Sequence, residues 1–221
     1  DRGFTLTNST TSTIEVVDPL ATLAFSGSSA ATTGSLLKTG PGILVLSGST
    51  SFTGFTRVNA GSLTVNNPNA LGSSTVDTQS GSVGTISFGG QLTVNIGGLI
   101  GLNPLVVQNQ AFQPVTLVVG RNGQNTTFGG EISGPGSLTK SGSGTLTLTG
   151  TNTFVGGLTA TGGLVGVGAD AMLGNVAGGF TMNGGGLQVQ GMSFTQWNQS
   201  RSLTIASGGG TFDVASAANT F

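Results

Sequence analysis

The chain of 221 residues contains no cysteine, no histidine and no tyrosine, and its single tryptophan is Trp197. The absence of cysteine excludes disulfides and thiol chemistry. Without histidine or cysteine, the Ser–His and Cys–His schemes of nucleophilic catalysis are excluded as well. Zinc sites lose their usual ligands for the same reason. We therefore expect neither a catalytic centre of these classes, nor a metal site, nor a cofactor.

Charge is scarce too, because charged residues make up 6% of the chain against about 25% in an ordinary soluble domain. The six basic residues are scattered, which argues against a nucleic-acid partner, since such proteins cluster Lys and Arg. No apolar run reaches about 18 residues, so we expect no membrane insertion. No signal peptide is visible at the N-terminus, which is compatible with a mature form, an excised piece or a cytosolic chain.

Glycine is abundant, with 41 residues, and it interrupts every long window in which a helix could form. Period-2 alternation is widespread and is clearest at Thr145–Thr149, where Leu and Thr alternate as in a half-buried strand. Similar short strands are expected along the whole chain, at Phe4–Thr7, Ser62–Val65, Gln91–Val94, Thr116–Val119, Leu187–Val189 and Ser202–Ile205. Clusters of Gly, Asn and Ser between them are typical of turns.

The sequence repeats itself without a gap: residues 35–72 return as residues 137–174, so that Lys38 corresponds to Lys140, 102 positions later. A fixed-period repeat indicates stacked units. A membrane barrel would need strands of about 9–11 residues and aromatic girdles, and a sandwich gives no reason for such a repeat. We expect one all-β domain over residues 1–221, a parallel β-solenoid of about ten coils at roughly 22 residues each. Apolar positions shared by both copies are predicted to point inward: Leu44/Leu146, Leu46/Leu148, Phe52/Phe154, Val65/Val167 and Leu71/Leu173.

The segment Leu138–Thr159, with its spaced Gly, Lys, Leu and Phe, resembles the autotransporter-associated β-strand repeat, also called the passenger-associated transport repeat. Ala70-Leu71-Gly72 and Met172-Leu173-Gly174 match its downstream Ala-Leu-Gly. The resemblance implies a right-handed parallel β-helix in a secreted or surface-anchored bacterial protein, often an adhesin-like passenger, with no catalytic residues. The signal peptide and the C-terminal translocator barrel of a complete autotransporter are not seen, which leaves the export route open.

Differences between the two copies indicate surface positions. Three apolar residues replace smaller or more polar ones at outward positions: Ile43, Val45 and Phe55 stand where the second copy has Thr145, Thr147 and Gly157. Together they would form a self-association patch, because exposed apolar patches mark interaction sites. The alternative is that a neighbouring loop or the stretch from Val16 to Phe25 covers them.

The two ends of the solenoid carry no recognisable polar cap, and each would expose unpaired strand edges. We expect end-to-end contacts through Phe4 and Leu6 at one end and Phe212 and Phe221 at the other. Two explanations remain open. The chain is a segment of a longer repetitive protein, or copies of it stack head-to-tail into a fibre.

The sequence thus favours a structural or adhesive module, a stalk or fibre subunit, whose partners are copies of itself, adjoining coils, a host surface or matrix polysaccharide. The alternative is a carbohydrate-binding or polysaccharide-degrading β-helix. Among the acids only Glu15 and Asp18 lie close in sequence, and a substrate groove would have to gather dispersed residues such as Asp77, Glu131, Arg121 or Trp197. Ice binding by Thr145, Thr147 and Thr149 is disfavoured because the first copy breaks the threonine array.

Overall fold

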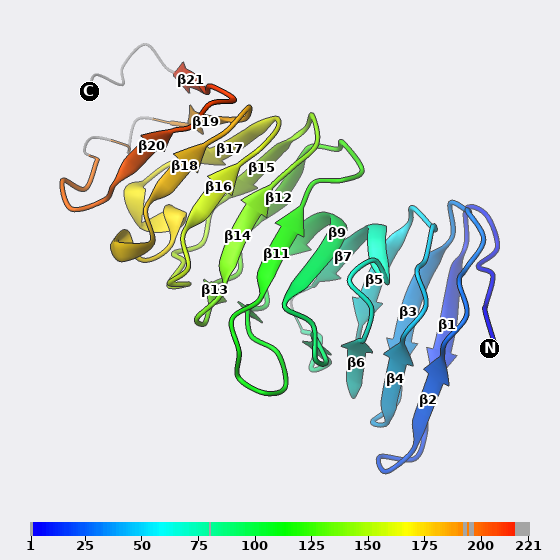
Figure 1. Ribbon diagram of the computed structural model, residues 1–221. Coiled ribbons are helices and arrows are strands. Elements are labelled where there is room, and N and C mark those ends of the chain that lie inside the picture. The colour runs from blue at the N-terminus through cyan, green and yellow to red at the C-terminus, as the bar shows by residue number, and fades with distance from the viewer. Residues whose placement is uncertain (1, 80, 192–193, 195–196, 215–221) are drawn as a thin grey trace.

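The computed structural model describes residues 2–79, 81–191, 194 and 197–214. It shows an all-β parallel solenoid of about nine turns, which confirms the fold class predicted from the sequence. The chain starts at one end of the stack and runs coil by coil to the other (Figure 1). The described helical segments are two short 3₁₀ turns, η1 (Asp170–Leu173) and η2 (Val176–Gly178).

Parallel pairing joins equivalent strands of successive coils in the N-terminal half. One line of strands consists of β1 (Thr11–Glu15), β3 (Ser35–Thr39), β5 (Phe55–Val58), β7 (Leu71–Thr78) and β9 (Thr93–Gly101). A separate four-stranded sheet forms a second side of the same coils: β2 (Thr22–Phe25), β4 (Ile43–Leu46), β6 (Ser62–Val65) and β8 (Thr85–Ser87).

Two lines of strands leave β9 toward the C-terminal end. The first consists of β11 (Thr116–Val119), β14 (Ser137–Lys140), β16 (Leu158–Ala160), β18 (Phe180–Met182) and β20 (Leu203–Ile205). The second consists of β12 (Thr126–Phe128), β15 (Thr145–Leu148), β17 (Leu164–Val167), β19 (Gly186–Val189) and β21 (Thr211–Val214). A third side holds the short pair β10 (Leu105–Val106) and β13 (Ile132–Ser133).

The two halves of the solenoid meet out of phase at β9, which means that strands of the second half do not continue the equivalent strands of the first. The first part of β9, up to Ile96, pairs with β11, whereas Gly101 at its end pairs with Phe128 of β12. The segment Gly98–Gly101 also pairs with β7, after a register shift between Leu71 and Thr75. The line that contains β15 therefore leads back to β3, although the counterpart of β15 in the first repeat copy is β4. Relative to the first copy, the second is turned by one side of the coil.

The core is a continuous column of apolar side chains from successive coils. All five pairs of positions that the repeat predicted to point inward are at most 1% exposed. Full burial of one such Leu or Phe contributes about 1.5–3 kcal/mol. Agreement between the repeat copies was therefore a correct guide to the interior, because each coil packs its inward side chains onto those of its neighbours.

Glycine at one corner is required by both conformation and space. Gly40 and Gly142 are equivalent in the two copies and adopt φ angles of 73° and 68°, in the left-handed region that other residues avoid. A Cβ atom at Gly142 would collide with the carbonyl oxygen of Gly120 in the coil below. This corner admits no side chain, which explains why glycine recurs there.

The prediction of a strand at Phe4–Thr7 is wrong, since these residues form no regular strand. Their side chains nevertheless enter the core, because Leu6 is 3% exposed and the Phe4 ring lies 5.0 Å from that of Phe25. The backbone instead leads into a turn in which the Thr10 N–H donates to the Thr7 carbonyl at 3.4 Å. Alternation of apolar residues predicted the burial correctly, but none of the described strands pairs with this segment.

Candidate interaction sites

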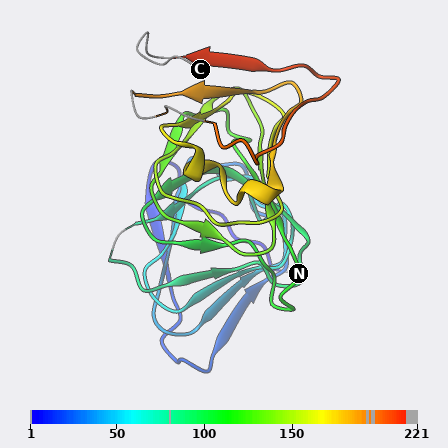
Figure 2. The same cartoon turned by 90° about the vertical axis from the view of Figure 1, so that its left-hand side faces the viewer.

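The C-terminal end of the described stack exposes side chains that every inner coil buries. Inward residues of the last coil are 40–60% exposed, whereas their partners one coil below are at most 1% exposed: Leu203 over Phe180, Ile205 over Met182, Phe212 over Leu187 and Val214 over Val189. Figure 2 views the molecule from this side, with β20 and β21 toward the end of the stack. An open hollow of about 340 Å³, lined by Leu187, Trp197, Leu203 and Phe212, has a wholly apolar surface.

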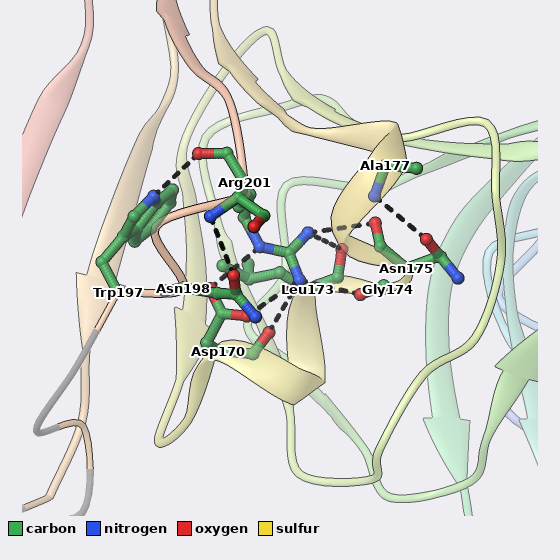
Figure 3. A network of polar contacts seen from close by, with 9 residues as sticks. Asp170, Leu173, Gly174, Asn175, Ala177, Trp197, Asn198 and Arg201 are labelled. Carbon is green, nitrogen blue, oxygen red and sulfur yellow. Dashed lines mark hydrogen bonds and ion pairs between the residues drawn. The ribbon is translucent and has the colours of Figure 1, made fainter.

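An aromatic cluster supports the floor of this hollow. The Trp197 ring lies 6.5 Å from Phe180 in an edge-to-face arrangement and 6.2 Å from Phe194. Its indole Nε1–H donates to the carbonyl of Arg201 at 3.1 Å, so the polar atom of the ring is satisfied (Figure 3). Trp197 is thus a packing residue whose apolar face is offered to the open end, and it does not lie in a polar groove.

Arg201 fixes the 3₁₀ turns beneath the same end (Figure 3). Its fully buried guanidinium binds both carboxylate oxygens of Asp170, at 2.9 Å from Nε and 3.0 Å from Nη2. It also donates to the carbonyls of Leu173 at 3.4 Å, Gly174 at 2.8 Å and Asn175 at 3.3 Å. The planar fork of Arg suits such a cluster of acceptors. No sequence signal indicated this network, because Asp170 and Arg201 are 31 positions apart.

The N-terminal end is partly closed by its own first residues. The Phe4 ring packs on Phe25 and lies 6.1 Å from the Phe52 ring. Phe4 thereby fills the space that a preceding coil would occupy. Leu23 of β2 nevertheless remains 38% exposed, although its partner Leu44 is fully buried. Of the residues predicted for end contacts, Phe4 and Leu6 thus pack at one end, Phe212 lies at the other, and Phe221 falls outside the described residues.

The three residues predicted to form a lateral patch lie on two different sheets. Ile43 and Val45 share the outer side of β4, with Ile43 36% exposed and Val45 half-buried. Phe55 lies on β5 in the other sheet, and its ring lies 4.8 Å from the Arg57 guanidinium. The structure brings two of the three together and separates the third. That this surface mediates self-association stays a prediction.

Two lysines that the sequence had marked only as repeat positions are completely buried. The Lys38 ammonium donates to the carbonyls of Thr39, Gly40 and Ala60, at 2.8, 2.8 and 3.2 Å. Burial lowers the pKa of Lys38, and the negative charge of Glu15 partly opposes this shift. Each ammonium ties its own corner to the corner of the next coil, so these cations stabilise the solenoid internally and do not contribute to its surface.

Lys140 repeats the same arrangement one copy later. Its ammonium donates to the carbonyls of Ser141, Gly142 and Gly162, at 2.5, 3.0 and 3.1 Å. Burial lowers the pKa of Lys140 to about 8. The recurrence of Lys in both copies was a signal for this role, but only the fold brings the second coil's carbonyl within reach.

The acidic residues considered for carbohydrate chemistry are dispersed over the solenoid. Asp77 forms an ion pair with Arg57, and Glu131 accepts a hydrogen bond from Thr153 at 2.6 Å. Asp18 caps a local turn by accepting from the Leu20 N–H at 2.9 Å. In the part of the chain that the structure describes, no group of three potential ligand side chains gathers to hold a metal ion. Within the same residues, no helix is long and apolar enough to cross a bilayer.

Comparison with known proteins agrees with the repeat seen in the sequence. A family model for the passenger-associated transport repeat matches residues 36–65 and 138–166, that is, the strands β3 to β6 and β14 to β17. Both matches include the buried lysine and the corner that follows it.

One curated relative is the Adhesin BmaC autotransporter of Brucella suis biovar 1 (strain 1330), 34% identical over 145 residues. The aligned part covers 63% of this chain but 4% of the adhesin, so the chain corresponds to a small fraction of that protein's length. Among solved structures, none matches the chain significantly.

Proposed function

Since this chain carries two passenger-associated transport repeats and is an autotransporter-associated repeat protein, we propose that it is an adhesive stalk module of a secreted or surface-exposed bacterial protein. Similarity to a protein named as an adhesin autotransporter supports the adhesive role. The long side faces of the solenoid would meet the host surface or matrix polysaccharide, and the stack of coils would act as a spacer.

The observation that carries the proposal is the exposure of inward side chains at the last described coil. Leu203 and Phe212 are 40% and 47% exposed, and together with Trp197 they line the apolar hollow. A further coil laid on β20 and β21 would bury these residues and pair both strands. We propose that the end of the stack accepts such a coil, either from an adjoining segment or head-to-tail from the N-terminal coil of another copy.

Sedimentation velocity and electron microscopy of the purified chain test this stacking. We expect concentration-dependent association into rods, and we expect Phe212→Asp to abolish it because a charge would have to enter an apolar contact. The matched control is Val155→Asp, which places a charge at an apolar residue 51% exposed on a lateral turn. Rods that persist in Phe212→Asp, or a chain that stays monomeric at every concentration, would overturn head-to-tail stacking.

The adhesive role is tested separately by displaying the chain on a non-adherent bacterium and counting cells bound to host cells and to polysaccharide-coated surfaces. Increased binding relative to an undecorated strain is expected, whereas equal binding would contradict the role. A catalytic β-helix has weaker support, because Asp77 and Asp170 are engaged by arginines. Incubation with polysaccharides and product analysis is expected to show no cleavage.

A further inference from the structure

A cleft of about 370 Å³ opens on the side of the solenoid where its two halves meet out of phase. It lies between β8, the last strand of the N-terminal four-stranded sheet, and β10, the first strand of the β10–β13 pair. Its volume falls in the range of about 300–1,000 Å³ that is usual for ligand sites. The cleft is therefore a consequence of the turn of one repeat copy relative to the other.

Both strands present a free backbone edge to this cleft. In β8 the Thr85 N–H donates to the Gly61 carbonyl at 2.9 Å, toward β6. The N–H and C=O of Ile86, one residue later, therefore point the opposite way, into the cleft, because successive residues of a strand alternate in direction. Within the described ranges, β8 pairs with β6 alone.

The edge of β10 has the complementary arrangement. The N–H groups of Leu105 and Val107 donate to the carbonyls of Glu131 and Ser133, both at 2.8 Å, on the side of β13. The peptide groups of Val106 therefore face β8. The backbone of Pro104 faces β8 as that of Val106 does, but proline has no N–H. One hydrogen bond is therefore missing from any direct pairing of β10 with β8. Proline at this edge thus helps to keep the two strands apart.

The entrance of the cleft is held open by a hydrogen-bonded turn. The Asn103 amide donates to the carbonyls of Gln79 and Ser82, both at 2.9 Å, which fixes the chain just before β10 against the loop that leads to β8. Beyond this point the two coils diverge around the cleft. The opening is consequently a built feature of the junction, bounded by residues with defined hydrogen bonds.

The lining selects for an uncharged ligand. Its one acidic residue, Asp77, is neutralised by Arg57, and the remaining side chains are apolar, hydroxyl or amide groups. Val83 and Val106, which are 81% and 44% exposed, give the rim an apolar character. Directional backbone donors and acceptors on two parallel edges are the features that recognise an extended polypeptide.

We propose that this cleft binds an extended, uncharged polypeptide segment as an added parallel β-strand. In β8 the residue whose N–H and C=O face the cleft is Ile86, and its side chain points inward. In β10 the corresponding residue is Val106, and its side chain points outward. An inserted strand with its inward residue level with Ile86 and Leu105 would therefore pair with both edges without a register shift. β8 has three residues, so about three residues of the ligand would be paired.

Fluorescence anisotropy with a labelled, end-capped peptide tests the proposal. The probe has the sequence of Ser143–Gly150, which is uncharged and carries the strand pattern of this protein. We expect saturable binding to the intact chain and at least a tenfold loss in Val106→Pro, which removes the donor facing the cleft. Val83→Asp, at an exposed position on the rim, should also weaken binding of the probe without affecting the fold.

Two controls locate the site and the mode of binding. Phe212→Asp alters the C-terminal end and should leave affinity for the probe unchanged; loss of binding in this variant instead would place the peptide at the open end and overturn the proposal. The probe N-methylated at both leucines should not bind, because it lacks the donors for β10. Equal binding of the methylated probe, or no binding of the unmodified probe at millimolar concentration, would also overturn strand addition.

Discussion

Lys38 and Lys140, 102 positions apart, make the same contacts in their coils: each ammonium binds the two carbonyls that follow it and one carbonyl 22 residues later. A buried ammonium has three donors, and all three are used here. The carbonyls that it binds are partly buried corner groups, and of these Thr39 also accepts from the Val16 N–H at 3.1 Å. The repeat thus encodes a cross-tie, that is, a buried ammonium hydrogen-bonded to two successive coils, in a chain of which 6% of the residues are charged.

Replacing Lys140 with Met should lower the free energy of unfolding by about 1–3 kcal/mol, because it removes three hydrogen bonds from a charged donor to partly buried carbonyls. Urea denaturation followed by circular dichroism measures the change. Arg121→Met is the matched control: Arg121 is exposed, and one guanidinium nitrogen, Nη1, binds Asn69 at 3.0 Å, so we expect a change within about 0.5 kcal/mol. Equal effects of the two variants would refute the cross-tie.

Stability should rise with pH between about 8 and 10.5. The pKa of Lys140 is lowered to about 8 in the folded chain from 10.5, so the unfolded state binds more protons in this window. The slope is at most about 1.4 kcal/mol per pH unit for each such lysine. Cys, His and Tyr are absent, so the two lysines are the only side chains that titrate in this range. Denaturation curves at several pH values check the slope, which should decrease in Lys140→Met. Stability that falls with pH would contradict the lowered pKa.

Gly157→Ala should destabilise the chain by at least about 2 kcal/mol. Gly157 has φ +86°, and an added Cβ would collide with the carbonyl oxygen of Gly178 in the next coil. Gly90→Ala is the control, since no heavy atom lies within 4 Å of its added Cβ and its φ is not in the left-handed region. Thermal melts should show a lower midpoint for the first variant alone. A Gly157→Ala variant as stable as Gly90→Ala would be inconsistent with the close stacking of corners.

Arg201→Met should cost about 3–5 kcal/mol, because it leaves the half-buried Asp170 carboxylate without its ion-pair partner, with the Asn198 N–H as a remaining donor at 3.3 Å. The effect should be concentrated at η1 and η2, whose carbonyls the guanidinium also binds. Limited proteolysis is expected to cleave first between Asp170 and Gly178. Cleavage that begins in the N-terminal coils would argue against this local role.

The double change Val45→Thr and Phe55→Gly should leave the fold intact, since it installs the residues of the second copy at half-buried outward positions. If the first copy carries a lateral self-association surface, the variant should associate more weakly side by side while end-to-end rods remain. Negative-stain micrographs separate the two modes. Bundled rods in the variant at the wild-type level would exclude the lateral surface.

Period-2 alternation and the repeat predicted the parallel β-helix and its interior correctly. Positions such as Leu44 and Phe154 could be assigned because burial in a solenoid depends on a local pattern that each coil repeats. The strand at Phe4–Thr7 failed for a related reason, since alternation reports which side chains are buried but not whether a neighbouring strand is present to pair. The cluster around Arg201 was out of reach, because its partners come from distant turns.

The amino-acid sequence by itself determined the type of coil, its glycine corners and its inward residues, because these depend on conformational preference and local alternation. The tertiary structure alone decided how the coils of the second repeat copy are rotated relative to those of the first. The register between β7 and β9 turns the second copy by one side of the coil, and it leaves Ile86 and Val106 on facing free edges. Pairing between coils is a long-range choice among edges with equivalent hydrogen-bonding groups, so no local pattern specifies it. The same long-range stacking brings Lys140 against Gly162 and buries its charge.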